Sequence, residues 1–110
     1  MQNEIATLIE DIKADYLRWT SRNGTKELND INHRMIAEFN SGLSVEEGRK
    51  YVKIVKSGSV WGFIVKETEG KFRKGDILKA ASWAAPARNH ARGNILDGGY
   101  SICWTGPHYM

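Results

Sequence analysis

The chain has 110 residues, of which 41% are hydrophobic and 26% are charged, and its formal net charge is +3. This length suits one domain with one modest core, and the composition argues against disorder. No apolar run reaches the roughly 20 residues of a membrane-spanning helix, and the acidic, periodic start does not resemble a signal peptide. Cys103 is the only cysteine, which excludes an internal disulfide and a zinc knuckle and favours a cytosolic protein.

The charged residues are distributed unevenly along the chain. Residues 1–47 carry five Lys/Arg and nine Asp/Glu, whereas residues 48–110 carry eleven Lys/Arg and four Asp/Glu. Such an asymmetry indicates that the second part binds an anionic partner. An equally simple interpretation is that the two parts neutralise each other across the fold or a dimer contact.

Two amphipathic helices are expected first. Apolar residues recur at steps of three and four over about residues 4–22, and Asn23-Gly24 is a stop signal. A second helix is predicted over about residues 26–40, with Thr25 as its cap. Its apolar stripe consists of Leu28, Ile31, Met35 and Phe39. The segment "LSVEEGRK" that follows is predicted to be a turn or a single helical turn.

From Lys50 the pattern changes to strands. "KYVKIVK" and "SVWGFIVK" are rich in β-branched and aromatic residues, and Ser57-Gly58 between them predicts a tight hairpin. Further strands are predicted within "KFRKGDILKA", entered through a Gly-Asp bend, and in "YSICWTG". The sequence therefore predicts an α+β fold in which two N-terminal helices pack on a C-terminal antiparallel sheet of about four strands. We expect a single domain over residues 1–110, with a helical part at 1–47 and a sheet part with a ligand-binding loop at 48–110.

The segment "ASWAAPARNHARGNILDGGY" has neither helical period nor strand alternation. It gathers planar, cationic and amide side chains, separated by small residues. Arginine binds phosphate through two parallel hydrogen bonds, amides pair with base edges, and aromatic rings stack on bases. With a nearby aromatic residue included, the predicted ligand-binding residues are Phe72, Trp83, Arg88, Asn89, His90, Arg92 and Asn94.

Each of these residues also has a structural interpretation. Trp83 could fill a core, Asn94 could form a turn, and Arg92 could pair with Asp76 or Asp97. Taken together, however, the run Arg-Asn-His-x-Arg-Gly-Asn is harder to explain by packing alone. The sequence therefore favours a ligand-binding loop.

Catalysis is a weaker alternative. His90 with Arg88 and Arg92 on either side would fit a small nuclease, with the histidine carrying a proton and the arginines stabilising charge. No second histidine or carboxylate pair lies nearby in the sequence, and the histidines lack metal-ligand spacing. We expect no catalytic residue, no metal and no cofactor. A small basic nucleic-acid-binding protein is another alternative, because exposed aromatic rings and cations suit single strands.

A second anion site is possible on the first helix. Arg18 and Arg22 lie one helical turn apart beside Trp19 and therefore share a face. The simpler interpretation is a solvated face near a helix C-terminus, where cations suit the helix dipole. The alternative is an anion site formed where helices of several subunits converge.

The run "KFRKGDILKAASWAAPARNHARGNILDGGYSICWTG" resembles the Thoeris anti-defence proteins of the first type, a family of small bacteriophage proteins. The resemblance spans about residues 51–106, and it departs at His90, where a larger aromatic residue is expected. It implies a non-enzymatic sponge that sequesters a cyclic ADP-ribose isomer of the glycocyclic type and so blocks effector activation. It also implies binding of cyclic di- or trinucleotides at a separate site, a homo-oligomer (a dimer or a larger assembly such as a hexamer) and a location in the cytoplasm of the infected bacterial host. A site that two subunits share would enclose more of such a ligand.

Overall fold

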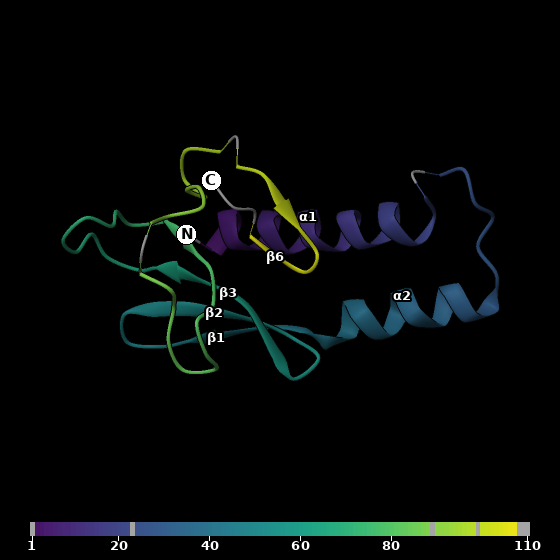
Figure 1. Ribbon diagram of the computed structural model, residues 1–110, viewed down its shortest axis with the longest axis horizontal. Coiled ribbons are helices and arrows are strands. Elements are labelled where there is room, and N and C mark those ends of the chain that lie inside the picture. The colour runs from purple at the N-terminus through teal and green to yellow at the C-terminus, as the bar shows by residue number, and fades with distance from the viewer. Residues whose placement is uncertain (1, 23, 89, 99, 108–110) are drawn as a thin grey trace.

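The computed structural model describes residues 2–22, 24–88, 90–98 and 100–107. A four-stranded antiparallel sheet has the order β1-β2-β3-β4, and β5 and β6 form a separate two-stranded ladder. The predicted α+β fold of two helices packed on an antiparallel sheet of about four strands is confirmed (Figure 1). The elements are α1 (Gln2–Thr20), α2 (Asp30–Gly42), β1 (Leu43–Glu47), β2 (Tyr51–Lys56), β3 (Ser59–Val65), β4 (Ile77–Leu78), β5 (Ile102–Cys103) and β6 (Gly106–Pro107).

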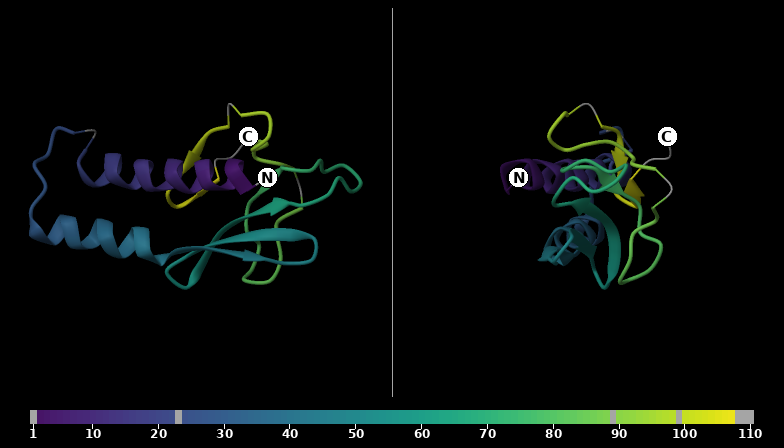
Figure 2. Two further views of the ribbon diagram at one scale, coloured as in Figure 1. Left: turned by 180° about the vertical axis from the view of Figure 1, so that it is seen from behind. Right: turned by 90° about the vertical axis from the view of Figure 1, so that its left-hand side faces the viewer.

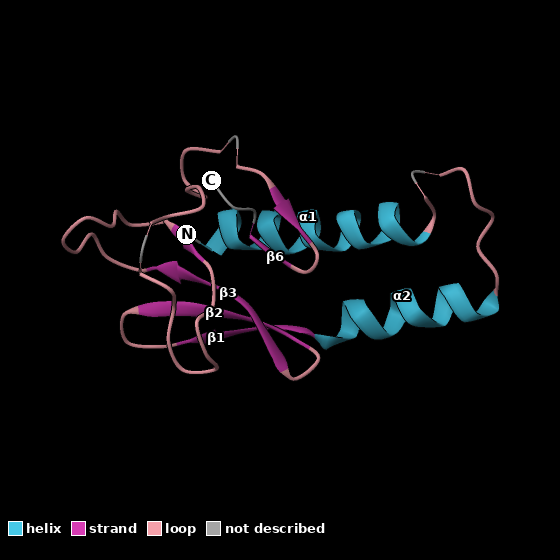
Figure 3. Ribbon diagram, viewed as in Figure 1, coloured by secondary structure: helices cyan, strands magenta, loops and turns pink. Residues whose placement is uncertain are grey.

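The molecule is elongated, with extents of 47 × 26 × 24 Å. The two helices run antiparallel, and the end of the pair that joins α1 to α2 projects beyond the sheet (Figures 1 and 2). The second helix leads directly into β1, while the short β5–β6 ladder lies beside α1 (Figure 3). The C-terminal ladder therefore packs against α1, although the two are far apart in the sequence.

Two apolar clusters hold the sheet in place. The first lies between the helices and the sheet and includes Leu8 and Ile12 from α1 and Ile54 from β2, all fully buried. The second comprises Phe63, Val65, Phe72 and Leu78, with partly buried residues of the 80–91 segment packed against it. Burial of this apolar surface is the main source of folding free energy. The second cluster also holds the 80–91 segment against the sheet.

Trp61 connects the sheet to the C-terminal ladder. The register pairs Ile54 with Gly62 and Val55 with Val60, so Trp61 is the extra residue of a β-bulge. Its ring is 1% exposed, and its indole Nε1 donates a hydrogen bond of 2.8 Å to the carbonyl oxygen of Cys103. This contact links β5 to β3 of the four-stranded sheet.

The hairpin between β2 and β3 forms as predicted. Ser57 has φ of 44° and Gly58 has φ of 83°. Two successive residues with positive φ are typical of the mirror-image turns whose twist matches that of paired strands. Glycine accepts this conformation at no steric cost.

The start of α2 is later than predicted, and its cap is a different residue. The side chain of Asn29 accepts a hydrogen bond of 2.9 Å from the backbone N–H of Asn32, whose side chain accepts one of 3.3 Å in return. This reciprocal pair satisfies two donors at the helix start. The Thr25 prediction was wrong, because the Thr25 hydroxyl donates to the carbonyl of Arg22 instead. Of the predicted stripe, Phe39 is buried, but two members are exposed: Ile31 (61%) and Met35 (39%).

The predicted turn over residues 43–50 was wrong for its first five residues, which form strand β1. Leu43 pairs with Lys56 and Glu47 with Val52, so this segment is the edge strand of the sheet. All its residues but Leu43 are exposed, and charged side chains are common on such edges. The predicted strand at 100–106 does not join the four-stranded sheet and instead forms the β5–β6 ladder.

Candidate functional site

The predicted ligand-binding loop is held by Asn94, which is only 6% exposed. Its Nδ2 donates hydrogen bonds of 2.9 Å to Asp76 Oδ1 and to the carbonyl of Lys74. Its Oδ1 accepts bonds from the backbone N–H groups of Leu96, at 2.8 Å, and Asp97, at 3.2 Å. An amide side chain has two donors and two acceptor positions, so these four bonds use its full capacity. Asn94 thus contacts protein rather than solvent.

Phe72 and Arg92 are also buried, at 3% and 2% exposure. The Phe72 ring belongs to the second apolar cluster, beside Leu78. The backbone N–H of Arg92 donates to the carbonyl of Ile77 at 2.7 Å, which holds this part of the loop against β4. Asp97 forms an ion pair with Arg73. The side chains of Phe72 and Arg92 therefore pack inside the protein, whereas the Arg73–Asp97 pair is exposed.

Trp83 and Arg88 lie at the surface. Trp83 is 50% exposed, and the ammonium of Lys53 lies 4.3 Å from its ring centroid. The guanidinium carbon of Arg88 lies 5.4 Å from the Phe72 ring centroid. Both are cation–π distances. Trp83 lines a hollow of 340 Å³ formed mainly by residues 46–53.

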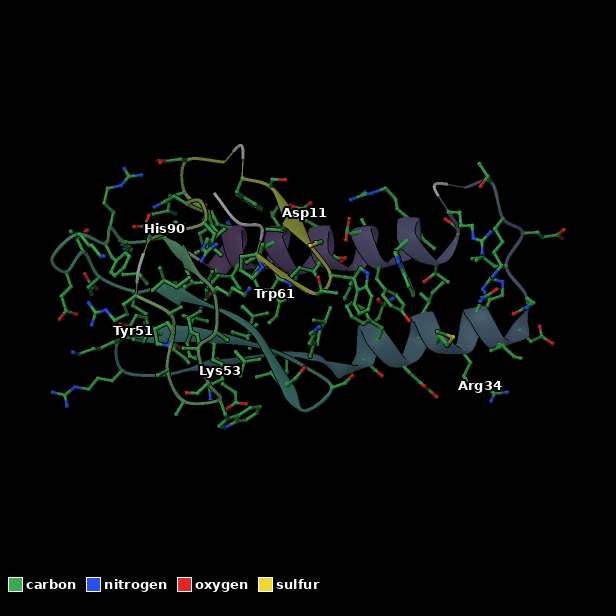
Figure 4. The ribbon with its side chains drawn as sticks, viewed as in Figure 1. Asp11, Arg34, Tyr51, Lys53, Trp61 and His90 are labelled. Carbon is green, nitrogen blue, oxygen red and sulfur yellow. The ribbon has the colours of Figure 1, made fainter. Side chains whose placement is uncertain are left out.

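His90 is exposed as well, and Figure 4 shows it apart from Lys53. Asn89 lies outside the described residues. The structure therefore divides the predicted set: some side chains build the loop, and others lie on its surface. The hollow beside Trp83 includes neither Arg88 nor His90 among its described lining residues.

A larger hollow lies at the projecting end of the helices, and we call it the interhelical groove. Its volume is 880 Å³. The C-terminal half of α1, the beginning of α2 and the turn between β5 and β6 form its walls. Its lining residues are Asp15, Arg18, Trp19, Thr20, Arg22, Lys26, Asn32, Met35, Cys103, Trp104 and Thr105.

The groove has a cationic side. Arg18, Arg22 and Lys26 line it, against the single carboxylate of Asp15 among its described lining residues. Arg18 and Arg22, which the sequence predicted as a second anion site, thus line the same groove. The prediction that they share a helix face was wrong, because α1 ends at Thr20 and Arg22 has φ of 51° in the turn that follows. A cationic hollow with low-dielectric walls concentrates anions near it.

The groove also has an aromatic side. The rings of Trp19 and Trp104 lie 5.1 Å apart between centroids, and Trp104 meets Tyr16 edge to face at 5.1 Å. Tyr16 in turn stacks on Phe39 at 4.1 Å. Trp19 is 57% exposed, so a large part of its ring faces solvent while its neighbours hold it in place. A half-exposed indole is a suitable platform for another flat ring.

Two carboxylates of α1 fix the C-terminal segment and with it the groove. Asp15 accepts hydrogen bonds from Arg18 Nη2 at 3.3 Å and from the backbone N–H of Trp104 at 2.8 Å. One turn earlier, the hydroxyl of Tyr100 donates to Asp11 at 3.0 Å. Burial, followed by the hydrogen bond and charge of Asp11, raises the pKa of Tyr100 to about 12. Asp15 thus connects a cation and an aromatic wall of the same groove.

Sequence reasoning identified Arg18 and Arg22 but missed the aromatic wall. Trp104 lies in a segment with the pattern of a strand, and no local pattern indicates that its ring meets Trp19. Lys26 was placed inside the second helix, whereas it lies in the connection before α2. In the sequence, the only sign of the groove is the pair Arg18 and Arg22 beside Trp19.

The described residues were also searched for a metal-binding cluster and for a membrane-spanning helix. Among residues 2–22, 24–88, 90–98 and 100–107, no group of three or more His, Cys, Asp or Glu side chains could hold a metal ion. Neither helix, as far as its residues are described, is both long and apolar enough to cross a membrane.

Of three comparisons with known proteins, one identifies the family of this chain. No match to the chain is found among curated proteins or among solved structures. A family model, that of the family of unknown function DUF7717, matches residues 1–105. This match covers nearly the whole chain, and the protein therefore belongs to the DUF7717 family.

Proposed function

We propose that this protein is a non-enzymatic binder that sequesters a small phosphorylated nucleotide in the interhelical groove. One observation carries the proposal: Arg18, Arg22 and Lys26 line the same 880 Å³ hollow as the rings of Trp19 and Trp104. Small-ligand sites have volumes of roughly 300–1,000 Å³, with a few well-placed polar groups among apolar ones. The groove fits that description.

Each part of the groove matches one part of a nucleotide. The guanidinium groups of Arg18 and Arg22 would bind the phosphates through paired, charge-assisted hydrogen bonds. The exposed face of Trp19 would stack on the base, an interaction worth about 1–3 kcal/mol in single-strand binding sites. Lys26 would add a further positive charge at the open rim.

The resemblance of residues 51–106 to Thoeris anti-defence proteins suggests which nucleotide this is. On that basis we propose an immune signal of the cyclic ADP-ribose type, with cyclic di- or trinucleotides as further ligands, and a protein that counters bacterial defence during phage infection. A useful sponge must bind tightly, and a nanomolar constant corresponds to roughly −12 kcal/mol. Several lining residues of the groove belong to the end of the helix pair that projects beyond the sheet (Figure 2), which leaves this end accessible to a second copy of the chain. We therefore propose a homo-oligomer as the active form.

The test measures both uptake and integrity of the ligand. The protein is incubated with glycocyclic ADP-ribose and, separately, with cyclic dinucleotides and trinucleotides, and binding is measured by calorimetry. The bound fraction is then released by heat and analysed by mass spectrometry. We expect uptake of at least one of these ligands and its recovery without chemical change. Recovery of an altered nucleotide would mean an enzyme, and uptake of none of them would remove the proposal.

Variants locate the site. Arg18→Ala and Arg22→Ala should each weaken binding by about 10- to 100-fold, the effect of losing a hydrogen bond to a charged group. Arg34→Ala is the matched control, because Arg34 is exposed on the side of α2 that faces away from α1 (Figure 4). Equal losses in all three variants would indicate a general charge effect and not this groove.

A second candidate function rests on the hollow beside Trp83. Its charged lining residues are Glu46, Glu47, Arg49, Lys50 and Lys53, so cations are in the majority beside the half-exposed Trp83 ring. Cations with an exposed aromatic ring suit a single-stranded nucleic acid. Affinity for an oligonucleotide that falls steeply with salt, and that Trp83→Ala abolishes, would favour this function. Groove binding of a small enclosed ligand should respond to salt much less.

A further inference from the structure

A second, smaller hollow adjoins the interhelical groove, and we call it the polar cleft. Its volume is 250 Å³, and it is lined by Asp11, Arg18, Tyr100, Ser101 and Ile102. Arg18 lines both hollows. Figure 4 shows Asp11 on α1 beside the C-terminal segment. A ligand whose phosphates lie on Arg18 can therefore extend in two directions, into the groove or into the cleft.

The cleft differs from the groove in its chemistry. It has one cation, one carboxylate and two hydroxyl groups, and Ile102 is its one apolar side chain among those described. An ionised carboxylate is an acceptor with about four lone-pair positions, so Asp11 can accept further bonds beyond that of Tyr100. Ser101 is exposed, and its hydroxyl can both donate and accept. Such a lining matches groups that are rich in hydroxyls and does not match a flat base.

The hydroxyl of Tyr100 has a fixed role in this cleft. It donates to Asp11 Oδ2 at 3.0 Å. The carboxylate is thereby held in one orientation on the helix. A carboxylate is also the group that accepts hydrogen bonds from ribose hydroxyls in dinucleotide-binding folds.

We propose that the polar cleft is a sugar subsite, and that the protein prefers nucleoside diphosphates that carry a second sugar on the far side of the diphosphate. This inference rests on the proposed function. The base stacks on Trp19 in the groove, the diphosphate lies on Arg18, and the second sugar enters the cleft, where Asp11 accepts its hydroxyl groups. Asp11 and Arg18 are seven residues apart on α1, or roughly 10 Å along the helix axis, a separation that a diphosphate and a sugar can span.

The geometry excludes a simpler ligand from using both hollows. In a nucleoside monophosphate the sugar lies between base and phosphate. With the base on Trp19 and the phosphate on Arg18, its single sugar cannot reach beyond Arg18 to Asp11. A molecule with a second sugar after the phosphates can fill the groove and the cleft together.

The experiment compares ADP-ribose with ADP, which lacks the second sugar. Calorimetric titration of the full chain should give an affinity for ADP-ribose about 10- to 100-fold higher than that for ADP, because one carboxylate gains hydrogen bonds from the sugar hydroxyls. Asp11→Asn should reduce this ratio to near one. Glu10→Gln is the matched control: it makes the same acid-to-amide change on the preceding residue, whose side chain lines a different hollow, and it should leave the ratio as in the wild type.

The outcomes separate the inference from the proposed function. If neither ADP-ribose nor ADP binds, the sugar subsite is refuted, while the titrations with cyclic nucleotides decide separately whether the groove binds nucleotides. If both bind with equal affinity, or if Asp11→Asn keeps the ratio, the groove stands and the sugar subsite is refuted. Should Asp11→Asn fail to fold, Ser101→Ala tests the same point: the sugar subsite requires the ratio to fall, and a ratio unchanged in this exposed-residue variant refutes it.

Discussion

Replacing Asn94 by alanine decides between the two roles that the sequence allows for this residue. The variant removes bonds to Asp76 and Lys74 and bonds from the N–H groups of Leu96 and Asp97. A net hydrogen bond contributes about 1 kcal/mol, and a buried group left without a partner costs about 1–3 kcal/mol. Leu96 and Asp97 are exposed, so water can satisfy part of the loss there. We expect Asn94→Ala to lower the free energy of unfolding by about 3 kcal/mol in total.

Thermal unfolding followed by circular dichroism measures this effect. For a chain of this size, about 1 kcal/mol corresponds to roughly 4 °C, so the expected fall in Tm is about 12 °C. Trp83→Ala serves as the comparison, because its ring is half exposed, and its Tm should change by no more than about 4 °C. A Tm for Asn94→Ala within about 2 °C of the wild type would refute the framework role. Loss of ligand binding at unchanged Tm would instead return Asn94 to the ligand site.

Three further predictions follow from individual contacts. Asn29→Ala should lower the free energy of unfolding by about 1 kcal/mol in urea titrations, whereas Thr25→Ala should change it by less than about 0.5 kcal/mol, because only Asn29 caps α2. Trp61→Phe should cost about 2–3 kcal/mol in the same assay, since it removes the indole hydrogen bond to β5 and leaves a small cavity. The raised pKa of Tyr100 contributes stability that is present below its ordinary value of 10 and is lost as pH rises towards about 12, so Tyr100→Phe should reduce the fall in Tm between pH 9 and 12.

Local chemistry explains which parts of the fold the sequence could predict. The Ser57-Gly58 hairpin depends on residues adjacent in the chain, and its turn and both strands were predicted correctly. The edge strand β1 was missed because its residues become a strand only by pairing with β2. Leu-Ser-Val-Glu-Glu has acidic residues that face solvent, which hides the alternation that marks a buried strand.

The cap of α2 illustrates competition between two local signals. Both Thr25 and Asn29 are residues that favour a helix start. Asn29 prevails because Asn32 returns a second bond, and together they satisfy two backbone donors. The helix consequently starts four residues later than predicted, and the connection before it is long enough to bring Lys26 to the groove.

The loop at residues 80–98 shows why composition alone could not define the site. Amides that read base edges also satisfy backbone donors, and guanidinium groups that bind phosphate also pack within loops. Sequence cannot separate these uses, since both need the same donors and acceptors. In the structure Asn94 meets four protein partners, whereas Trp83 lies half exposed.

Arg18 of α1 and Arg22, which follows the end of that helix, show the opposite case. Their spacing in the sequence was compatible both with a solvated helix face and with an anion site. Choosing between these interpretations requires the tertiary structure. Asp15 binds Arg18 and the backbone of Trp104 at once, so the position of the cation and the position of the aromatic wall depend on the same carboxylate. A solvated face has no reason to couple them. A ligand that carries a phosphate and a flat ring needs both groups at a fixed separation, and this coupling supplies it.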